Sequence, residues 1–396
     1  MIQHLFKLVW NRKRTNALIA VEIFFSFLIL FAITAFGFYY ADNYRRPPGF
    51  SSENVWVIEF NYPNWSQEVP ATVRRLFLSL KDFEEVESCA GASVTLVPYS
   101  NSRAAYDIEY KGRKADTQTG EGTDGLEKVL DMELIQGRWF EKGDDALKWK
   151  PAIINQRLSR ELFGSEDPLG KTIGDYTGRV VGVISDFRRN GEFSEPGNLA
   201  IRRVSLNDSA LVSSKGFGLP SNILIKVRPG TRAAFEEKLM AKLQAIAQGW
   251  TFHIRPMSQM RASYLKLRLA PLIGVGLVAA FLILMVGLGL MGVLWQNVTQ
   301  RTKEIGLRRS SGATAQDIYR QIIGELLAIT TLGILAGTLV IVQFPLLKLF
   351  SFLSAQVTII SLAISIGFMY LLTVLCGLYP ARLATRIQPA EALHYE

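Results

Sequence analysis

Four long apolar segments constrain this chain more strongly than any other feature of its sequence. We assign them to residues 17–40, 267–296, 321–347 and 356–379, and the stretch 269–295 contains 27 consecutive residues without a charge. A helix of that length extends about 40 Å, more than the roughly 30 Å hydrocarbon core of a bilayer. The sequence therefore predicts an α-helical membrane protein with four transmembrane helices.

The first apolar segment has two readings, a cleaved signal peptide or a permanent anchor. It runs for 24 residues, carries one acid, Glu22, and ends in the aromatic run Phe38, Tyr39 and Tyr40. Signal peptides have shorter apolar cores that are followed by small residues at a cleavage site. Aromatic residues instead gather where a spanning helix reaches the membrane surface. We therefore predict an uncleaved anchor.

Basic residues beside the spans predict the orientation of the chain. They are Lys7, Arg12, Lys13 and Arg14 before the first span, Arg301, Lys303, Arg308, Arg309 and Arg320 between the second and third, and Arg382 and Arg386 after the fourth. The short loop 348–355 contains only Lys348. Because short cytoplasmic segments carry the excess of Lys and Arg, the tail 380–396, the N-terminus and the loop 297–320 are predicted in the cytoplasm. Residues 41–266 then lie outside the cytoplasm, in a multi-pass membrane protein.

The net charge of +9 is explained by these flanks and does not indicate nucleic-acid binding. No basic run is combined with the aromatic residues that stack bases in nucleic-acid-binding proteins. Residues 1–16 mix apolar and basic side chains, which predicts a short amphipathic helix on the lipid surface. The alternative is a basic tail that serves only to set the topology.

Residues 41–266 have the pattern of a folded α+β domain of one or two lobes. Runs rich in β-branched residues predict strands, and apolar residues at helical spacing predict helices. The predicted strands are 55–60, 151–155, 179–184 and 222–227, and the predicted helices are 68–80, 156–163 and 231–248, the last with Thr231 as its N-cap. The fold class is thus four transmembrane helices with an inserted extracytoplasmic α+β domain.

The sequence offers little for catalysis. Residues 164–172 (GSEDPLGKT) look like a phosphate-binding loop, but five residues instead of four separate the glycines, and Asp167 and Pro168 would disrupt a cradle of backbone N–H groups. We interpret this segment as a turn. The three histidines, His4, His253 and His394, fall on different sides of the membrane. We expect no catalytic, metal or cofactor site in this chain.

The cytoplasmic loop predicts a short helix over 301–309. On it Ile305 shares a face with Arg301, Arg308 and Arg309, and this face is expected to meet the cytoplasm. Gly312 fits a helix stop, and Thr314 is an N-cap candidate for the next helix, with Asp317 three residues on. On the residues alone, these positive charges could serve only topology and contacts with lipid headgroups.

Several motifs resemble the MacB/FtsX-type permeases of ABC transporters, also called type VII exporters. The clearest are RTKEIGLRRSSGAT at 301–314, YPARLA at 379–384 and QPAEAL at 388–393. Weaker ones follow in the family's order in the outer domain, at 137–140, 154–155, 162–164, 167–171 and 180–183. The resemblance covers essentially the whole chain.

The resemblance implies that two permease copies, or this chain and a homologous one, pair and work with a separate cytoplasmic ATPase that binds ATP and Mg²⁺. The chain starts 16 residues before its first span and so differs from members with a fused ATPase. The coupling helix that docks on the ATPase would comprise Thr302, Lys303, Glu304, Ile305, Gly306, Leu307, Arg308, Arg309, Gly312 and Ala313. ATP-driven movement would then reach the outer domain through the second span.

Two intramembrane acids, Glu22 and Glu325, admit two interpretations. They could form proton or ion sites, as ionisable residues in membranes often do. We favour local pairing near the cytoplasmic interface, with Arg14 or Arg320, because ATP supplies the energy in the resembled family.

Three functions remain open at this stage. The first is export of peptides, antibiotics, lipids or lipoproteins, with a possible periplasmic adaptor and outer-membrane channel. The second is FtsX-like signalling to a cell-wall hydrolase. The third, a membrane receptor, would need a cytoplasmic output domain, and no cytoplasmic segment is long enough to fold alone. The large outer domain favours export.

Overall fold

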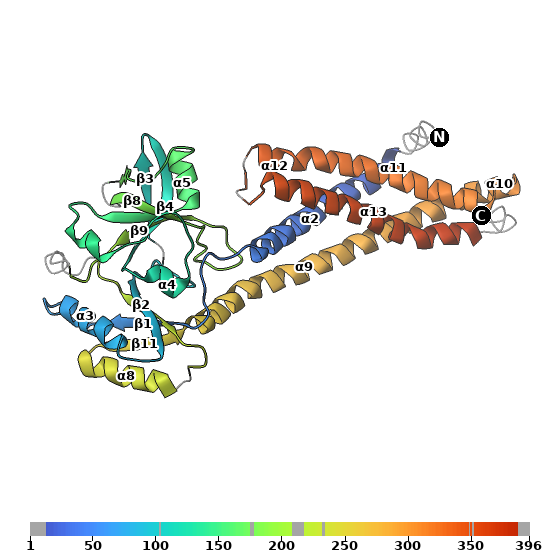
Figure 1. The fold of residues 1–396 in the computed structure, drawn as a ribbon. Coiled ribbons are helices and arrows are strands. Elements are labelled where there is room, and N and C mark those ends of the chain that lie inside the picture. The colour runs from blue at the N-terminus through green and yellow to red at the C-terminus, as the bar shows by residue number, and fades with distance from the viewer. Residues whose placement is uncertain are drawn as a thin grey trace. The chain divides into compact units, whose positions relative to one another are not determined.

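The computed structural model describes residues 13–102, 104–174, 178–207, 218–231, 234–347, 349–350 and 352–386 (Figure 1). The chain divides into two compact units, Asn43–Leu269 and the remainder, Met1–Asp42 with Ala270–Glu396. We describe each unit by itself. The expected amphipathic helix over 1–16 falls almost wholly outside the described residues, as does the tail after residue 386.

Four described helices are long and apolar enough to span a membrane, which confirms the predicted number of spans. They are α2 (Lys13–Arg45), α9 (Met257–Gln300), α11 (Ala315–Ile341, followed by the short α12, Gln343–Leu346) and α13 (Ala355–Arg386). The helix α9 is the main surprise, because its 44 residues begin well before the apolar stretch that starts at Leu269. Helical structure continues through the polar residues that precede the span.

Small residues allow the membrane helices to pack closely. A Cβ atom at Gly333 of α11 would lie 2.6 Å from Ile23 Cγ2 of α2, and one at Gly337 would lie 2.5 Å from Phe27 Cδ1. Ile23 and Phe27 are almost fully buried at this contact. The small-residue spacing in the third span therefore marks a helix contact, as is usual for helices that associate in lipid.

The outer unit is built on a sheet of eleven described strands. The strands are β1 (Val55–Asn61), β2 (Val86–Ala92), β3 (Ala105–Tyr110), β4 (Arg113–Gly122), β5 (Leu134–Gly137), β6 (Pro151–Asn155), β7 (Thr172–Ile173), β8 (Gly178–Ile184), β9 (Asn198–Arg203), β10 (Asn222–Val227) and β11 (Thr251–Pro256). The helices are α3 (Val69–Leu80), α4 (Leu126–Leu130), the 3₁₀ turn η1 (Lys142–Ala146), α5 (Gln156–Phe163) and α8 (Ala234–Ile246).

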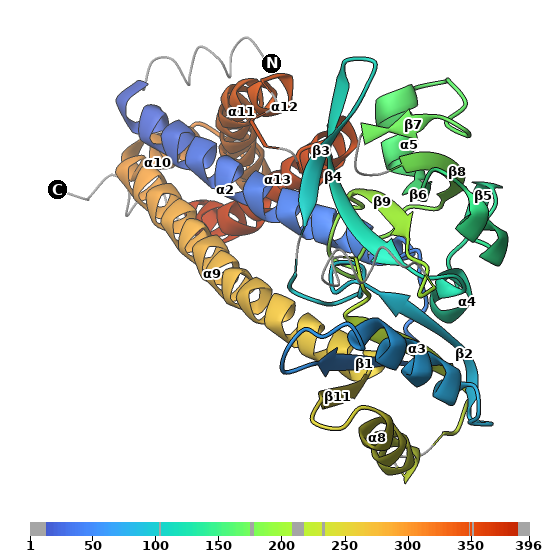
Figure 2. The same ribbon diagram turned by 90° about the vertical axis from the view of Figure 1, so that its left-hand side faces the viewer.

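One half of the sheet has the strand order β11-β1-β10-β2 and is antiparallel throughout. The helices α3 and α8 lie beside it (Figure 2). Leu76 of α3 and Leu239 of α8 are fully buried against Ile58 and Ile225 of the sheet. This is a split β-α-β arrangement, in which β10 lies between two strands that are closer in sequence to each other.

The other half runs β4-β9-β6-β8-β5 and mixes parallel with antiparallel pairs. Its helix α5 buries Leu158 and Leu162 against Ile154 and Val180. The two halves join through one residue pair, Ala92 with Gly122, on β2 and β4. The outer unit is thus a single sheet in which each half has a core of its own and a third core contains residues from both halves.

Most of the predicted outer-domain elements are confirmed at or near their predicted bounds. Residues 164–172 form the predicted turn, in which the Asp167 side chain accepts a hydrogen bond from the Leu169 N–H (3.0 Å). The N-cap predicted at Thr231 stays a prediction, because residues 232 and 233 lie outside the described part of the chain and the described part of α8 begins at Ala234. The Thr231 hydroxyl donates to the Arg228 carbonyl (2.7 Å).

Candidate functional site

A short helix, α10 (Thr302–Ser310), connects the second and third membrane helices, as predicted. Its end is defined by Gly312, whose φ of +97° is a left-handed conformation that favours glycine. The next helix starts with a capping box, in which Asp317 N–H donates to Thr314 Oγ1 (3.2 Å) and Thr314 N–H donates to Asp317 Oδ2 (3.0 Å). Both local predictions for this loop are confirmed.

The orientation of α10 differs from the expected one. Ile305 is only 5% exposed and packs against Val298 and Ile318, whereas Leu307 is 59% exposed. The face that carries Ile305, Arg301 and Arg308 therefore packs toward the neighbouring helices and is not the exposed face of α10. The reason is that the side chains of α11 offer both an apolar patch and polar partners to this face.

Those polar partners form a chain of contacts among α10, α11 and Arg301, the residue between α9 and α10. Arg301, just after α9, forms an ion pair with Glu325 of α11, and their side chains are 14% and 9% exposed. Gln321 Nε2 donates to Glu325 Oε1 (3.0 Å) and its carbonyl oxygen accepts from Arg308 of α10. Arg308 also pairs with Glu304 (2.9 Å), one turn earlier in α10. Buried charges need such pairing, because an unpaired charge is costly away from water.

The predicted pairing of Glu325 with Arg320 was wrong. Arg320 lies five residues before Glu325 on α11, which places it about 140° around the helix. Arg320 is exposed, whereas Gln321, one turn from Glu325, shares its face. The sequence did carry a signal for the network, since Gln321 and Glu325 are four residues apart, but nothing local pointed to Arg301.

The other intramembrane acid, Glu22 of α2, is half-buried and lies against Gly289 of α9, where any Cβ atom would collide with its carboxylate. Among the described side chains no ion-pair partner of Glu22 is found. The side chain of Arg14, its expected partner, lies outside the described part of the structure. Pairing of Glu22 therefore stays a prediction.

The remaining members of the predicted site lie on α10 or just after it. Lys303 and Gly312 are exposed beside Leu307, as are the neighbouring Ser310 and Ser311, whereas Gly306 is buried and Ala313 is half-buried. Thr302 and Arg309 belong to α10, but their side chains are outside the described part. The exposed surface of the loop is thus one apolar side chain surrounded by polar and small ones. Such a surface can dock on a protein partner.

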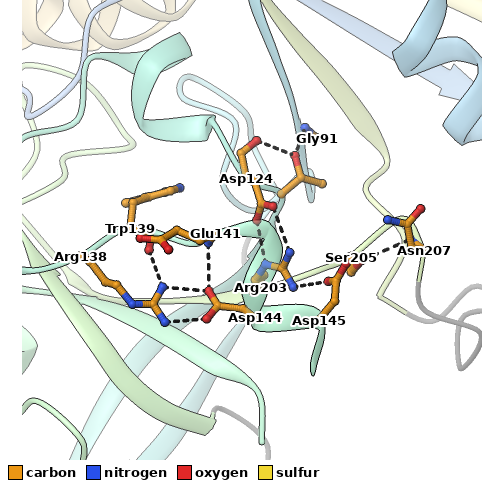
Figure 3. Close-up of polar contacts among 11 residues, drawn as sticks. Gly91, Asp124, Arg138, Trp139, Glu141, Asp144, Asp145, Arg203, Ser205 and Asn207 are labelled. Atoms are coloured by element: carbon orange, nitrogen blue, oxygen red, sulfur yellow. Dashed lines mark hydrogen bonds and ion pairs between the residues drawn. The ribbon is translucent and has the colours of Figure 1, made fainter. Parts of the chain in front are cut away.

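In the outer unit, a second polar network fixes a loop and a turn (Figure 3). The nearly buried Arg203 at the end of β9 donates to Asp124 Oδ1 (2.7 Å), after β4, and to Asp145 Oδ1 (2.6 Å) of η1. Arg138 pairs with Asp144 at 2.5 Å. Burial works against the ionised form of Asp144 and Asp145, but their hydrogen bonds prevail and hold the pKa of each below its usual value.

These contacts are structural. In the described residues there is no group of three or more His, Cys, Asp or Glu side chains that could hold a metal ion. The turn at 164–172 also does not form a phosphate cradle. Its Glu166 carboxylate makes ion pairs with Lys111 (3.1 Å) and Lys171 (3.0 Å), the basic groups that a phosphate would need.

Comparison with known proteins agrees with this architecture. Residues 23–242 match the MacB-like periplasmic core domain, and residues 276–389 match the FtsX-like permease C-terminal domain. The macrolide export ATP-binding/permease protein MacB of Bdellovibrio bacteriovorus is 28% identical over 340 residues, which cover 81% of this chain and 50% of MacB. The ABC transporter permease YknZ of Bacillus subtilis is 27% identical over 321 residues, which cover 79% of this chain and 78% of YknZ.

Among solved structures, the periplasmic region of MacB from Actinobacillus actinomycetemcomitans aligns with a TM-score of 0.38 at 16% identity, covering 54% of this chain and 92% of that region. The chain spans about half the length of the MacB relatives it matches. The periplasmic core match covers more than half of the chain, and the permease match covers the later part of the second span and the whole of the third and fourth. This chain therefore belongs to the MacB/FtsX-type family of ABC transporter permeases.

Proposed function

We propose that the chain is a transport subunit that carries mechanical movement from a cytoplasmic ATPase to its outer domain. The observation that carries this proposal is the helix α9, which runs from β11 to the residue before Arg301 as one helix with Pro271 inside it. Its 44 residues correspond to about 66 Å of helix. A continuous helix transmits a displacement at one end to the other end, whereas a flexible linker does not.

The ATPase would dock on the exposed surface of α10, with Leu307 as the apolar anchor and Lys303 beside it. Ile305 would act from the inside, because its burial against Val298 and Ile318 fixes the orientation of α10. A buried anchor on each partner, surrounded by polar residues, is the usual arrangement at protein interfaces. Substrate would not need to cross the core of the four helices.

Recovery of a partner tests this assignment. The protein, solubilised with mild detergent from its native host, should co-purify with a nucleotide-binding subunit. Leu307→Glu should abolish that co-purification, since it places a charge at the centre of the contact. Two control variants are available. Thr331→Glu also changes an exposed side chain, but Thr331 lies on α11 within the span region. Lys303→Ala changes an exposed residue of α10 and keeps Leu307, so it is the better matched control and should weaken docking only modestly. Retention of the ATPase by Leu307→Glu would rule out this docking surface.

A second permease copy, or a homologous permease, would pair with this chain along α9. Only 6% of the apolar part of α9 is buried within the chain. Leu277, Phe281, Leu284 and Leu288 are 61–69% exposed and recur at helical spacing on one stripe. Oxidation of the Leu284→Cys variant in native membranes should give a disulfide-linked dimer. A chain that stays monomeric under oxidation would indicate that lipid covers this face.

We assign the chain to a bacterial inner membrane with both termini in the cytoplasm. The basic flanks of the spans support this orientation. A cysteine placed near the N-terminus should react with a membrane-impermeant maleimide only after the cells are lysed. A cysteine at exposed Leu134 of the outer unit should react in spheroplasts.

The cargo would be a molecule outside the cytoplasm, such as an antimicrobial peptide, an antibiotic or a lipid. Relatives are named for export of macrolides and of pyoverdine, which supports export over signalling to a cell-wall hydrolase or release of lipoproteins. A periplasmic adaptor and an outer-membrane channel would complete the route in a Gram-negative host. Deletion of the chain should sensitise the host to the exported compound and leave cell separation normal.

A further inference from the structure

A buried arginine in the outer unit caps the end of the first membrane helix. Arg188, in the loop after β8, is 2% exposed. Its Nη1 donates to the carbonyls of Asn43 and Arg46, each at 2.8 Å, although these residues lie more than 140 positions earlier. The same guanidinium holds its own loop, through the carbonyls of Glu192 (2.7 Å) and Ser194 (2.7 Å).

The position of this arginine matters because α2 ends at Arg45. The last carbonyls of a helix have no donors within the helix, and a positive charge there is favoured by the helix dipole. Arg188 satisfies the Asn43 carbonyl in that last turn. The backbone N–H of Arg188 also donates to the Pro48 carbonyl (2.8 Å), so the chain that leaves α2 is held at three points.

The same loop holds the beginning of α9. Glu192 is 7% exposed, and its Oε1 accepts from Arg261 Nε (2.6 Å) in the second turn of α9. The Tyr99 hydroxyl lies 3.4 Å from the same oxygen, and burial together with the Glu192 charge raises the pKa of Tyr99 to about 12. Tyr99 therefore stays protonated and can donate to Glu192 at any physiological pH.

Aromatic contacts reinforce both attachments. Phe193 of the loop stacks on Tyr44 of α2, with ring centroids 5.4 Å apart. Tyr99 packs against Tyr264 of α9, with centroids 5.9 Å apart. Residues 188–194 thus contact the outer ends of the two membrane helices that lead into the outer unit.

We propose that residues 188–194 form a stem clamp, which ties the outer end of α2 to the first turns of α9 so that both move with the outer domain as one body. The role in movement rests on the proposed function, whereas the tie itself does not. In the resulting scheme Arg188 and Glu192 are positioning residues. A displacement that arrives along α9 would pass through Arg261 and Glu192 to Arg188 and α2.

The neighbouring Arg189 provides a matched control. It is also buried, at 6% exposure, and lies in the same loop. Its guanidinium donates to Ser100 Oγ (2.9 Å) and to the Ser102 carbonyl, in a loop of the outer domain. Arg189→Ala therefore removes a buried arginine of the same loop and leaves the contacts of Arg188 with Asn43 and Arg46 in place.

The tie is tested by hydrogen–deuterium exchange on the full-length chain in lipid nanodiscs. Arg188→Ala should increase exchange in the last turn of α2 and in 46–50 about tenfold or more, because charge-assisted hydrogen bonds are lost there. Glu192→Gln should increase exchange in 257–264 and spare 41–46. Equal increases in Arg188→Ala and Arg189→Ala, or no increase in 41–46, would overturn the clamp. Arg188→Lys covers the case in which Arg188→Ala does not fold, since it keeps the charge but reaches fewer carbonyls, and it should show a smaller increase at the same sites.

The role in movement is tested with the ATPase bound. Arg188→Ala should retain the co-purified ATPase and its basal ATP hydrolysis but lose the ATP-dependent change in outer-domain position, and Arg189→Ala should keep it. Normal movement in Arg188→Ala would overturn this role. If the wild type recovers no ATPase, the proposed function fails while the exchange experiment still decides the tie.

Discussion

Loss of the Glu325 carboxylate should release α10 from the membrane helices. In Glu325→Ala, Arg301 keeps its charge at 14% side-chain exposure without its partner, and Gln321 loses one acceptor. Breaking a buried ion pair by removing one partner costs about 3–5 kcal/mol. The exposed pair Glu304–Arg308, at 34% and 38% side-chain exposure, is worth only about 0.3–0.5 kcal/mol, so Glu304→Ala is the control.

Trypsin provides the assay, because Lys303 and Arg308 lie within α10 and are cleaved only when it unfolds locally. When opening is fast, the cleavage rate follows the population of the open form. A loss of about 3 kcal/mol corresponds to more than a hundredfold faster cleavage, and about 0.5 kcal/mol to roughly twofold. The double variant Arg301→Met with Glu325→Leu should recover most of the protection, since an apolar pair can replace a buried ion pair. If Glu325→Ala is cleaved no faster than Glu304→Ala, the network does not hold α10.

Three further predictions concern other parts of the chain. Gly337→Leu should reduce the yield of folded protein on size-exclusion chromatography, because its side chain would collide with Phe27, whereas Gly274→Leu, at a site with open space, should be tolerated; equal loss in both would argue against the helix contact. The pKa of Asp144 is lowered in the fold, so its stabilising effect is present above the unfolded pKa of about 4 and is lost as the pH falls through the lower folded pKa. On acidification, thermal melts should therefore show a smaller loss of stability in Asp144→Asn than in the wild type. Arg138→Ala should destabilise the outer unit at pH 7 by about 1–3 kcal/mol in urea denaturation followed by tryptophan fluorescence, and an unchanged midpoint would show that the pair contributes nothing.

Local patterns predicted some elements of this fold to the residue. The strand β6 and the helix α5 have the predicted bounds, since a short continuous apolar run and the Asn155 N-cap act within a few residues of the chain. The strand β4 was missed because its sequence, RKADTQTGEG, has almost no apolar residues. A Cβ atom at Gly120 would lie 2.4 Å from Leu96 Cγ, and one at Gly122 would lie 2.9 Å from Leu126 Cδ2, and only the tertiary structure reveals these contacts.

The sequence contains a signal for the start of α9 that the predicted span, which begins at residue 267, did not include. Met257, Met260 and Tyr264 follow the i, i+3, i+7 spacing of an amphipathic helix, and all three pack into the core of the outer unit. This amphipathic signal is weaker than the continuous run of apolar residues after Leu269, on which the prediction of the span rested. The direction of α10 and the pairing of Arg301 with Glu325 could not be read, because both depend on how α11 packs beside the loop.

Transmission of movement by α9 can be tested by measuring one distance. Spin labels at Leu134 in the two permease copies of the reconstituted transporter would report the separation of the outer domains with and without ATP and vanadate. The wild type should show a nucleotide-dependent change in this separation. A flexible Gly-Ser insertion after Leu269 should abolish that change while the ATPase stays bound and active. An unaltered nucleotide-dependent change in the insertion variant would contradict the account.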